Sequence, residues 1–209
     1  MRRRHTPERQ EQGERAQVRV IAGRWRGRPL LFNARPGLRP TPNRVRETLF
    51  NWLQGEVAGA RVLDLFAGSG ALAFEALSRG ATSAVLLEAD AQSARQLREQ
   101  AALFAASEVC DIHQDDALRW LQKTAMPCFD LVFLDPPFDA RLWQAALQLL
   151  HERAWLSPDA WVYVEAPRRQ ELALPEDPWS PHRQLIAGDV CARLLRYRPV
   201  QSAAVIDTQ

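Results

Sequence analysis

The sequence predicts an α/β fold, in which a parallel sheet carries helices on both faces and is followed by an antiparallel hairpin. Three observations support this prediction. From residue 60 onward, short β-rich runs alternate with helical segments, a pattern typical of parallel sheets. A glycine-rich turn joins the first of these runs to the helix after it. Near the C-terminus, Gly188-Asp189 separates two further β-rich runs, as in a hairpin.

Composition limits the class of protein. The chain has 209 residues, 46% apolar and 25% charged, which fits one globular domain with an appendage. No apolar run approaches the ~20 residues needed to span a bilayer, and residues 1–20 lack the apolar core of a secretory signal. Three widely spaced cysteines and four scattered histidines indicate neither a disulfide framework nor a zinc site. We therefore expect a cytoplasmic protein without a metal, and nothing requires more than a monomer.

The charge is unevenly distributed along the chain. Residues 1–50 hold 13 arginines and 4 acidic residues, a balance of +9, whereas the rest of the chain has a balance of −7. Lys123 is the only lysine. A bias toward arginine codons would explain arginine in place of lysine, but it does not explain where the charges lie. A basic first segment on an acidic body indicates a polyanionic partner such as a nucleic acid.

The basic segment is expected to form an extension of the main domain. Residues 1–17 have almost no apolar side chains and are predicted to be a disordered basic tail. Residues 18–32 alternate apolar and polar side chains, which predicts two short strands joined by a turn. The arginines on one face of this hairpin are Arg24, Arg26 and Arg28.

A helix should complete the extension, which we place at residues 18–59. Thr41 followed by Pro42 is a favourable N-cap and first-turn pair. The apolar stripe of an amphipathic helix follows, formed by Val45, Leu49, Trp52 and Leu53. We expect the helix to end near Gly55.

The main domain is predicted to cover residues 60–199, followed by a tail at 200–209. Its parallel strands are expected at 61–65, 83–88, 109–113, 129–134 and 160–165. Its helices are expected at 70–78, 91–105, 117–123 and 141–151. The terminal hairpin should pair 184–187 with 190–197.

The glycine-rich turn has the features of a cofactor-binding loop. Gly68-x-Gly70-x-x-Ala73 follows a buried strand and begins a helix, so the backbone can approach a ligand near free N–H groups. Asp64 lies at the end of that strand. Its charge would repel a pyrophosphate but would hold a ligand with an ammonium group, such as S-adenosylmethionine.

Two further acidic positions follow the next strands. Glu88 ends the second strand, where a carboxylate can accept hydrogen bonds from ribose hydroxyls. Asp116, in the pair Asp115-Asp116, follows the third strand and is the preferred acceptor for an adenine amino group. The alternative role for Glu88 is to cap the helix predicted at 91–105, although Asp90 is the better candidate for that cap. The alternative role for Asp115 or Asp116 is to be the N-cap of the helix predicted at 117–123.

Asp135-Pro136-Pro137-Phe138 follows the fourth strand and is the decisive motif. The two prolines hold the loop extended and remove two backbone donors, so acceptors and the Asp135 carboxylate can converge on one point. Hydrogen bonds to an exocyclic amino group localise its lone pair and make the nitrogen a nucleophile. Phe138 offers a flat surface on which a base can stack.

Together these motifs resemble class I S-adenosylmethionine-dependent methyltransferases that act on amino groups, whose signature is (Asp/Asn/Ser)-Pro-Pro-(Phe/Tyr). Within that class the chain resembles the RsmD family over about residues 18–199. The segments that carry the resemblance are 21–28, 37–53, 64–72, 132–138 and 162–165. The segment with Arg39-Pro40-Thr41 and Arg44-Val45-Arg46-Glu47 is not general to methyltransferases.

The resemblance implies a Rossmann-like fold and methylation of the N2 amino group of one guanine in bacterial small-subunit (16S) ribosomal RNA, within an assembled or assembling 30S particle. S-adenosylmethionine would be the cofactor, S-adenosylhomocysteine the product, and no metal would be needed. The residues that would hold the cofactor are Asp64, Phe66, Ala67, Gly68, Gly70, Glu88, Asp116 and Ala117. Those that would bind and activate the guanine are Asp135, Pro136, Pro137 and Phe138. Those that would contact RNA or close over the site are Arg24, Arg26, Arg28, Arg39, Thr41, Arg44 and Arg46.

Three other functions remain open at this stage. A DNA or other amino-methyltransferase would use the same Asp-Pro-Pro-Phe loop, although a DNA enzyme usually carries a larger recognition insertion. A nicotinamide-dependent oxidoreductase would use the same glycine loop, but Asp64 and the double proline argue against it. A ribosome-assembly factor that has lost its chemistry is disfavoured because Asp64, Glu88 and Asp135 are all present.

Overall fold

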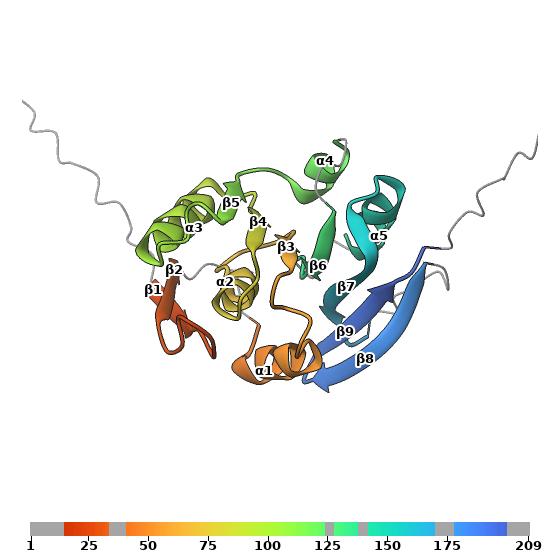
Figure 1. Ribbon diagram of the computed structural model, residues 1–209, viewed down its shortest axis with the longest axis horizontal. Coiled ribbons are helices and arrows are strands. Elements are labelled where there is room, and N and C mark those ends of the chain that lie inside the picture. The colour runs from red at the N-terminus through yellow and green to blue at the C-terminus, as the bar shows by residue number, and fades with distance from the viewer. Residues whose placement is uncertain (1–14, 34–40, 124–127, 138–141, 170–177, 200–209) are drawn as a thin grey trace, which may run out of the picture.

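A twisted seven-stranded sheet forms the centre of the protein in the computed structural model, which describes residues 15–33, 41–123, 128–137, 142–169 and 178–199 (Figure 1). Strands β1 (Arg15–Arg19) and β2 (Pro29–Asn33) form a separate antiparallel pair. The seven strands of the central sheet are β3 (Arg61–Asp64), β4 (Ser83–Leu87), β5 (Cys110–His113), β6 (Phe129–Leu134), β7 (Leu156–Pro167), β8 (Trp179–Ala187) and β9 (Val190–Tyr197). The helices are α1 (Asn43–Trp52), α2 (Ala71–Ser78), α3 (Ala91–Leu103), α4 (Ala117–Leu121) and α5 (Trp143–Glu152).

The predicted sheet topology is confirmed. The strand order is β5-β4-β3-β6-β7-β9-β8, with parallel pairing from β5 to β7 and antiparallel pairing of β9 with both β7 and β8. The chain moves outward from β3 to β5 and then returns to place β6 on the other side of β3. Parallel sheets bind ligands at such a reversal, outside the carboxyl ends of the strands.

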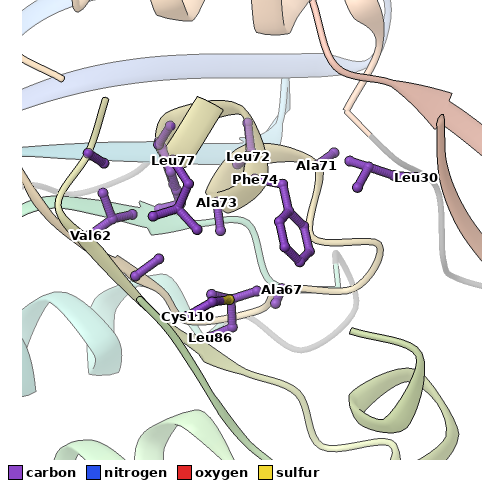
Figure 2. Packing of buried hydrophobic residues seen from close by; sticks show 14 of the residues in the cluster. Leu30, Val62, Ala67, Ala71, Leu72, Ala73, Phe74, Leu77, Leu86 and Cys110 are labelled. Carbon is purple, nitrogen blue, oxygen red and sulfur yellow. The ribbon is translucent and has the colours of Figure 1, made fainter. Parts of the chain in front are cut away.

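Two apolar layers cover the two faces of the sheet. Helices α1, α2 and α3 lie on one face and α4 and α5 on the other (Figure 1). Neighbouring residues of one strand belong to different layers, as Val62 and Leu63 of β3 show. Around α2, the ring of Phe74 lies among small and branched side chains that include Ala67 and Leu86 (Figure 2). Helix α2 is buried along its whole length, which fixes the glycine turn that precedes it.

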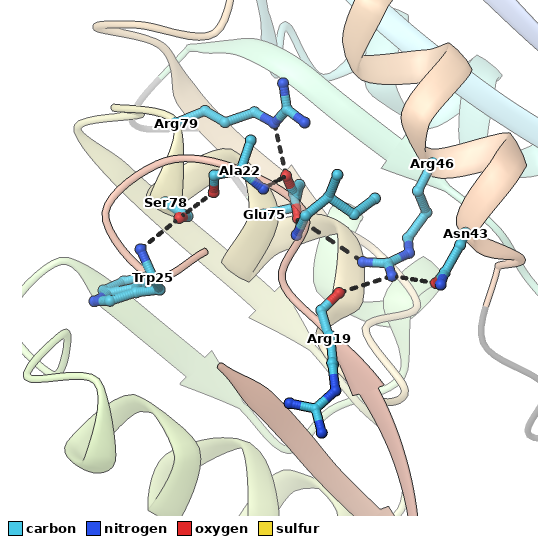
Figure 3. A network of polar contacts seen from close by, with 9 residues as sticks. Arg19, Ala22, Trp25, Asn43, Arg46, Glu75, Ser78 and Arg79 are labelled. Atoms are coloured by element: carbon cyan, nitrogen blue, oxygen red, sulfur yellow. Dashed lines mark hydrogen bonds and ion pairs between the residues drawn. The ribbon is translucent and has the colours of Figure 1, made fainter. Parts of the chain in front are cut away.

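The N-terminal extension is anchored to the end of α2 (Figure 3). The backbone N–H groups of Ile21 and Ala22 donate to the Glu75 carboxylate at 2.7 and 3.0 Å. The N–H of Trp25 donates to Ser78 Oγ, and that hydroxyl donates to Ala22 O. A Cβ on Gly23 would lie 1.9 Å from Ser78 O, so only glycine allows this close contact.

Several predicted boundaries were wrong. Residues 15–17 belong to strand β1 and not to a disordered tail, because alternating Ala16, Val18 and Val20 pack against the α2–α3 layer. The rest of that predicted tail, and residues 200–209, lie outside the described residues. Strand β8 begins at Trp179, five residues before the predicted start, and β7 extends from Leu156 to Pro167.

The predicted positions of the hairpin arginines also need correction. Arg24, Arg26 and Arg28 lie in the turn between β1 and β2 and not on a strand face. Gly23 and Gly27 both have positive φ angles, 81° and 79°, so this segment turns where the alternating pattern predicted extended backbone.

Candidate active site

Four carboxylates form a row along the carboxyl edge of the sheet. They come from four adjacent strands, in the order Glu88 after β4, Asp64 on β3, Asp135 after β6 and Glu165 on β7. The residues two positions earlier all belong to the α1–α3 core layer, namely Leu86, Val62, Phe133 and Tyr163. Because side chains alternate along a strand, the four carboxylates face that same side. The sheet therefore presents a negative surface at the point where the chain reverses.

The glycine turn fits a ligand that approaches the backbone closely. Gly68 and Gly70 adopt positive φ angles, 51° and 74°, and the Gly70 N–H donates to Ala67 O at 2.6 Å. Gly70 is the N-cap of α2, and a Cβ there would lie 2.7 Å from the side chains of Phe74 and Leu97. Predicted cofactor residues in this turn are thus brought together, with Phe66 half-buried and Ala67 buried.

Asp64 is a buried carboxylate suited to a cationic ligand. It is 2% exposed, and burial raises its pKa to about 7, although the N–H groups of Phe66 and Ala73 donate to it and oppose that rise. The nearby charge of Glu88 raises the pKa further. A positively charged group beside Asp64 would stabilise the ionised carboxylate and lower its pKa. The ammonium group of S-adenosylmethionine is such a group. This part of the described structure therefore fits the implied cofactor.

Glu88 is held in place by two backbone donors. Its Oε2 accepts from Gly68 N–H at 3.0 Å and its Oε1 from Asp90 N–H at 2.9 Å. Asp90 is the N-cap of α3, as predicted, and accepts from Ser93 N–H at 2.8 Å. Glu88 thus joins the glycine turn to the start of α3.

Asp135 faces a hydroxyl and two other carboxylates. Thr41 Oγ1 donates to Asp135 Oδ2 at 3.4 Å. Desolvation and the charges of Glu165 and Asp64 raise the pKa of Asp135 well above its usual value, while the bond from Thr41 opposes the rise. Pro136 is buried and Pro137 exposed. Phe138 lies outside the described residues.

Thr41 does not cap α1 as predicted. The N-cap is Pro42, in an extended conformation and without a side-chain cap. The first turn is instead closed by Pro42 O, which accepts from Val45 N–H and Arg46 N–H. This leaves the Thr41 hydroxyl available to Asp135, so the start of α1 contacts the site directly.

Asp116 caps α4, which was the alternative to an adenine contact. Its Oδ1 accepts from Arg119 N–H at 2.8 Å, and the residue is exposed. Its neighbour Asp115 forms ion pairs with Arg119 and Lys123, which lower the pKa of Asp115 to about 2. Ala117, the first residue of α4, is buried. Asp116 therefore has a structural role, and it lies after β5 at the same edge of the sheet as the glycine turn.

The predicted RNA-contacting arginines do not gather at one place. The turn with Arg24, Arg26 and Arg28 lies against the last residue of α2, since Arg24 N–H donates to Ser78 O at 2.8 Å. Helices α2 and α3 run back from the carboxyl edge, so their ends lie at the opposite edge of the sheet. Arg28 donates to Leu103 O at the end of α3 and lies over the Phe104 ring. Arg39 is outside the described residues.

Arg46 was predicted to contact RNA, but the structure contradicts this. Its side chain is 0% exposed, pairs with Glu75 at 3.9 Å, and donates to Arg19 O and Asn43 Oδ1 (Figure 3). Arg46 lies three and four residues before Leu49 and Phe50, on the buried face of α1. That spacing was the sequence signal for burial. Arg44, in contrast, is exposed in the first turn of α1, beside the site.

Sequence reasoning gave no role to two groups that the structure adds. Glu165 and Tyr163 lie beside Asp135 at the end of β7, and Arg168 and Arg169 are exposed just after that strand. Arg168 N–H donates to Asp189 O in the terminal hairpin. The pairing of β6 with β7 brings these residues to the site. The register of that pairing cannot be predicted from a single sequence.

Within the described part of the chain, no helix is long and apolar enough to cross a bilayer. No three His, Cys, Asp or Glu side chains are grouped so as to hold a metal ion, again among the described residues. Cys110, Cys128 and Cys191 are free thiols.

Comparisons with known proteins agree with this geometry. Residues 18–196 match the family model described as conserved hypothetical protein 95. The chain is 44% identical over 180 residues to ribosomal RNA small subunit methyltransferase D of Escherichia coli K12, covering 85% of this chain and 89% of that protein. It is likewise 44% identical over 182 residues to the Haemophilus influenzae protein of the same name, covering 86% and 94%. The solved yhhF protein of Escherichia coli superposes with a TM-score of 0.79 at 41% identity, covering 88% of this chain and all of that one.

Proposed function

The chain belongs to the conserved hypothetical protein 95 family, that of the RsmD ribosomal RNA small subunit methyltransferases, and on this premise we propose its reaction in detail. It transfers a methyl group from S-adenosylmethionine to the exocyclic N2 amino group of one guanine in small-subunit ribosomal RNA. The observation that carries this proposal is the position of Asp135. It follows β6, next to the glycine turn and Asp64 at the carboxyl end of β3, so one edge of the sheet holds both a cation-binding carboxylate and an acceptor for an amino group.

The cofactor would lie along the β3–α2 turn. Asp64, Phe66, Ala67, Gly68 and Gly70 would surround its methionine part, because the turn offers N–H groups and a buried negative charge. When bound, S-adenosylmethionine supplies an electrophilic methyl group on a positively charged sulfur.

The adenosine part of the cofactor would be held by the next two strands. Glu88 would accept hydrogen bonds from the ribose hydroxyls, and its two backbone donors keep its oxygens oriented for this. Asp116 and Ala117 would contact the adenine from the start of α4. A metal ion is not needed for any of these contacts.

The guanine would be bound by Asp135 and the prolines after it. The Asp135 carboxylate and the Pro136 carbonyl would accept hydrogen bonds from the amino group, and Phe138 would stack on the base. A guanine stacked in an RNA helix must leave its stack to reach such a loop, at a cost of a few kcal/mol. Most of the acceleration would come from holding the nitrogen and the methyl group in reactive geometry, with the carboxylate stabilising the positive charge that develops on nitrogen.

The RNA would be contacted from the carboxyl edge of the sheet. Arg44, Arg168 and Arg169 are exposed there, and they are suited to phosphates that flank the target guanine. Arg24 and Arg26 are exposed at the opposite edge and would make a second contact with a large substrate such as an assembled or assembling 30S particle. Arg39, which lies outside the described residues, would also contact RNA, as the resemblance implies.

The test is methyl transfer followed by nucleoside identification. The purified protein is incubated with methyl-labelled S-adenosylmethionine and, separately, unmethylated small-subunit particles, free ribosomal RNA and duplex DNA. Label in N2-methylguanosine from particles or RNA is the expected result. Label in a DNA base would overturn the substrate, and cofactor binding without transfer to any of them would favour a non-catalytic assembly factor.

A further inference from the structure

The buried carboxylate of Glu165 lies beside Asp135 in the sheet. In the parallel pairing of β6 with β7, Leu134 is opposite Val164, so Asp135 and Glu165 follow as the next pair. Their predecessors Phe133 and Tyr163 share one core layer, with ring centroids 6.3 Å apart. Adjacent strands are about 4.8 Å apart, which makes the two carboxylates direct neighbours on the same face.

Glu165 is held by hydroxyl groups. It is 4% exposed, its Oε2 accepts from Tyr163 Oη at 2.8 Å, and its second donor is the Thr41 hydroxyl, whose single proton can go to either Glu165 or Asp135. Within the described residues no Arg, Lys or His forms an ion pair with it. Since a buried charge is normally paired, retaining a carboxylate here requires an explanation other than stability.

We propose that Glu165 is a positioning residue which, with Tyr163 and Thr41, makes Asp135 the acceptor of the proton that the target amino group loses. The inference rests on the proposed function. In the reaction a bond forms between the amino nitrogen and the methyl carbon as the carbon–sulfur bond breaks, and that electron pair stays on sulfur. The nitrogen then carries a positive charge and gives one proton to the Asp135 carboxylate, which releases it to solvent after product departure.

The charges around Asp135 support this role. Asp64 faces it from β3 and Glu165 from β7, while the uncharged Thr41 hydroxyl faces it from the segment before α1. Burial is the largest cause of the raised pKa of Asp135, and the two negative charges raise it further. A carboxylate with a raised pKa is a stronger base. Tyr163, whose own pKa is raised well above 10 by burial and by Glu165, remains a hydrogen-bond donor across the working range.

The primary test compares Glu165→Gln with wild type. Glutamine keeps an oxygen that accepts from Tyr163 but removes the charge, so the pKa of Asp135 falls. We expect kcat on RNA to decrease by up to about 10-fold, because a base weakened by about one pKa unit loses at most a factor of ten, which is less than the 10²–10⁴-fold for complete loss of acid–base assistance. The acid limb of the kcat–pH profile should move to lower pH by about 1 unit, since removing a nearby like charge favours ionised Asp135. The Kd for S-adenosylmethionine should change less than about 3-fold, which corresponds to under 1 kcal/mol.

Two further variants separate this role from a structural one. Glu165→Asp retains the charge and should keep the acid limb near the wild-type position. Tyr163→Phe keeps the side-chain volume, raises the pKa of Glu165 by removing its donor, and should move the limb in the same direction as Glu165→Gln by a smaller amount. The matched control is Asp159→Asn. Asp159 is an exposed carboxylate of the same strand, paired with Arg196 and Arg198 away from the site, and its loss should leave the profile unchanged.

A measurement without RNA distinguishes the two proposals. The infrared carbonyl band of protonated Asp135, assigned by its loss in Asp135→Asn, should titrate at lower pH in Glu165→Gln than in wild type. An unchanged titration or an unchanged acid limb would overturn the role of Glu165 while guanine methylation stands. A wild-type protein that methylates no guanine would instead overturn the proposed function, and the proton-transfer role with it.

Discussion

At the scale of single residues, the proposed function makes Asp135 the side chain on which methyl transfer should depend most directly. Replacing it with alanine removes the acceptor of the amino group, and we expect kcat to fall by about 10²- to 10³-fold or more, the size of effect seen when one preorganised hydrogen-bonding group is removed from an active site. Cofactor affinity should be nearly unchanged, because the glycine turn and Asp64 remain. Single-turnover methylation and calorimetric cofactor binding measure the two effects. Equal loss of both would contradict the assigned role.

Asp64 should make the cofactor-free protein less stable as the pH rises. Its pKa is about 7 in the fold against 3.8 as the ordinary value, so between these values the folded state holds a proton that the unfolded state has lost. The free energy of unfolding therefore decreases from about pH 4 to pH 7, by up to about 4 kcal/mol from this residue. Asp64→Asn lacks this titration and should be more stable than wild type at pH 8, with a flatter dependence.

Urea denaturation at pH 5, 6, 7 and 8 checks this prediction. The Asp135 and Glu165 carboxyls, whose pKa values are also raised, contribute in the same direction to both proteins. The difference between the two curves is therefore attributable mainly to Asp64. Parallel curves would contradict the prediction, because they would show that ionisation of Asp64 does not destabilise the cofactor-free protein.

Single residues also show what the sequence predicts well. Asp64, Glu88 and Asp135 were identified because each ends an apolar run, and the ends of parallel strands meet at one edge. Glu165 lay in a segment noted for its resemblance but received no role, since only the pairing of Leu134 with Val164 places it beside Asp135. Arg46 was expected to contact RNA or close over the site because of the family resemblance, whereas its burial follows from its position on the apolar face of α1.

At the scale of elements, the turn before α2 should tolerate no side chain at Gly70. Gly70→Ala places a Cβ 2.7 Å from Phe74 and Leu97 at a φ of +74°. Gly27→Ala is a matched control, because its φ is +79° but nothing lies within 4 Å of the new Cβ. Both should lose about 1–2 kcal/mol for the left-handed conformation. Gly70→Ala should lose more, together with cofactor affinity, as thermal unfolding and calorimetry would show.

Glu75 joins three elements and should be costly to neutralise. It accepts from the backbone of Ile21 and Ala22, pairs with Arg79 at 2.7 Å, and faces the fully buried Arg46 of α1. Burial lowers the pKa of Arg46, and Glu75 opposes that effect. Glu75→Gln leaves that buried charge without its partner, so we expect a loss of about 3–5 kcal/mol.

The control for Glu75 is Glu99→Gln. That residue forms an exposed pair with Arg95 one helical turn away, and its loss should change stability by no more than about 0.5 kcal/mol. Hydrogen exchange should additionally show faster exchange at residues 20–28 in Glu75→Gln. Equal exchange in the two variants would contradict the anchoring role.

At the scale of the whole molecule, the two edges of the sheet should contribute differently to RNA binding. Neutralising Arg44, Arg168 and Arg169 together should reduce the slope of log K against log salt by about 0.7–0.9 for each phosphate that is no longer neutralised, and should reduce kcat/KM. Neutralising Arg24 and Arg26 should weaken binding to particles without reducing kcat. Arg153→Gln, an exposed residue after α5, is the control. Equal effects of the two clusters on kcat would contradict this division.

The α/β architecture was predictable from the periodicity of the sequence, and the strand order follows the expected topology. The path of the N-terminal extension was not predictable from the sequence. The basic charge and the family resemblance placed its arginines near the RNA. The structure instead holds the turn at the edge of the sheet opposite the site, through contacts of Glu75 and Ser78 with the backbone that a sequence does not reveal. Thr41 was assigned to helix capping by a local rule, and a tertiary contact with Asp135 takes its place.

The docking of the N-terminal hairpin on later helices has a consequence for synthesis. Trp25 packs on Phe74 and Phe104, so the hairpin leaves the ribosome before the surface that buries it exists. About 80 residues separate Trp25 from Phe104 in the chain, which at about 5–20 residues per second takes roughly 4–16 s. During that interval Val18, Val20, Trp25, Leu30 and Phe32 lack the surface on which they pack in the folded protein, and this surface is complete only once α3 and Phe104 have been made.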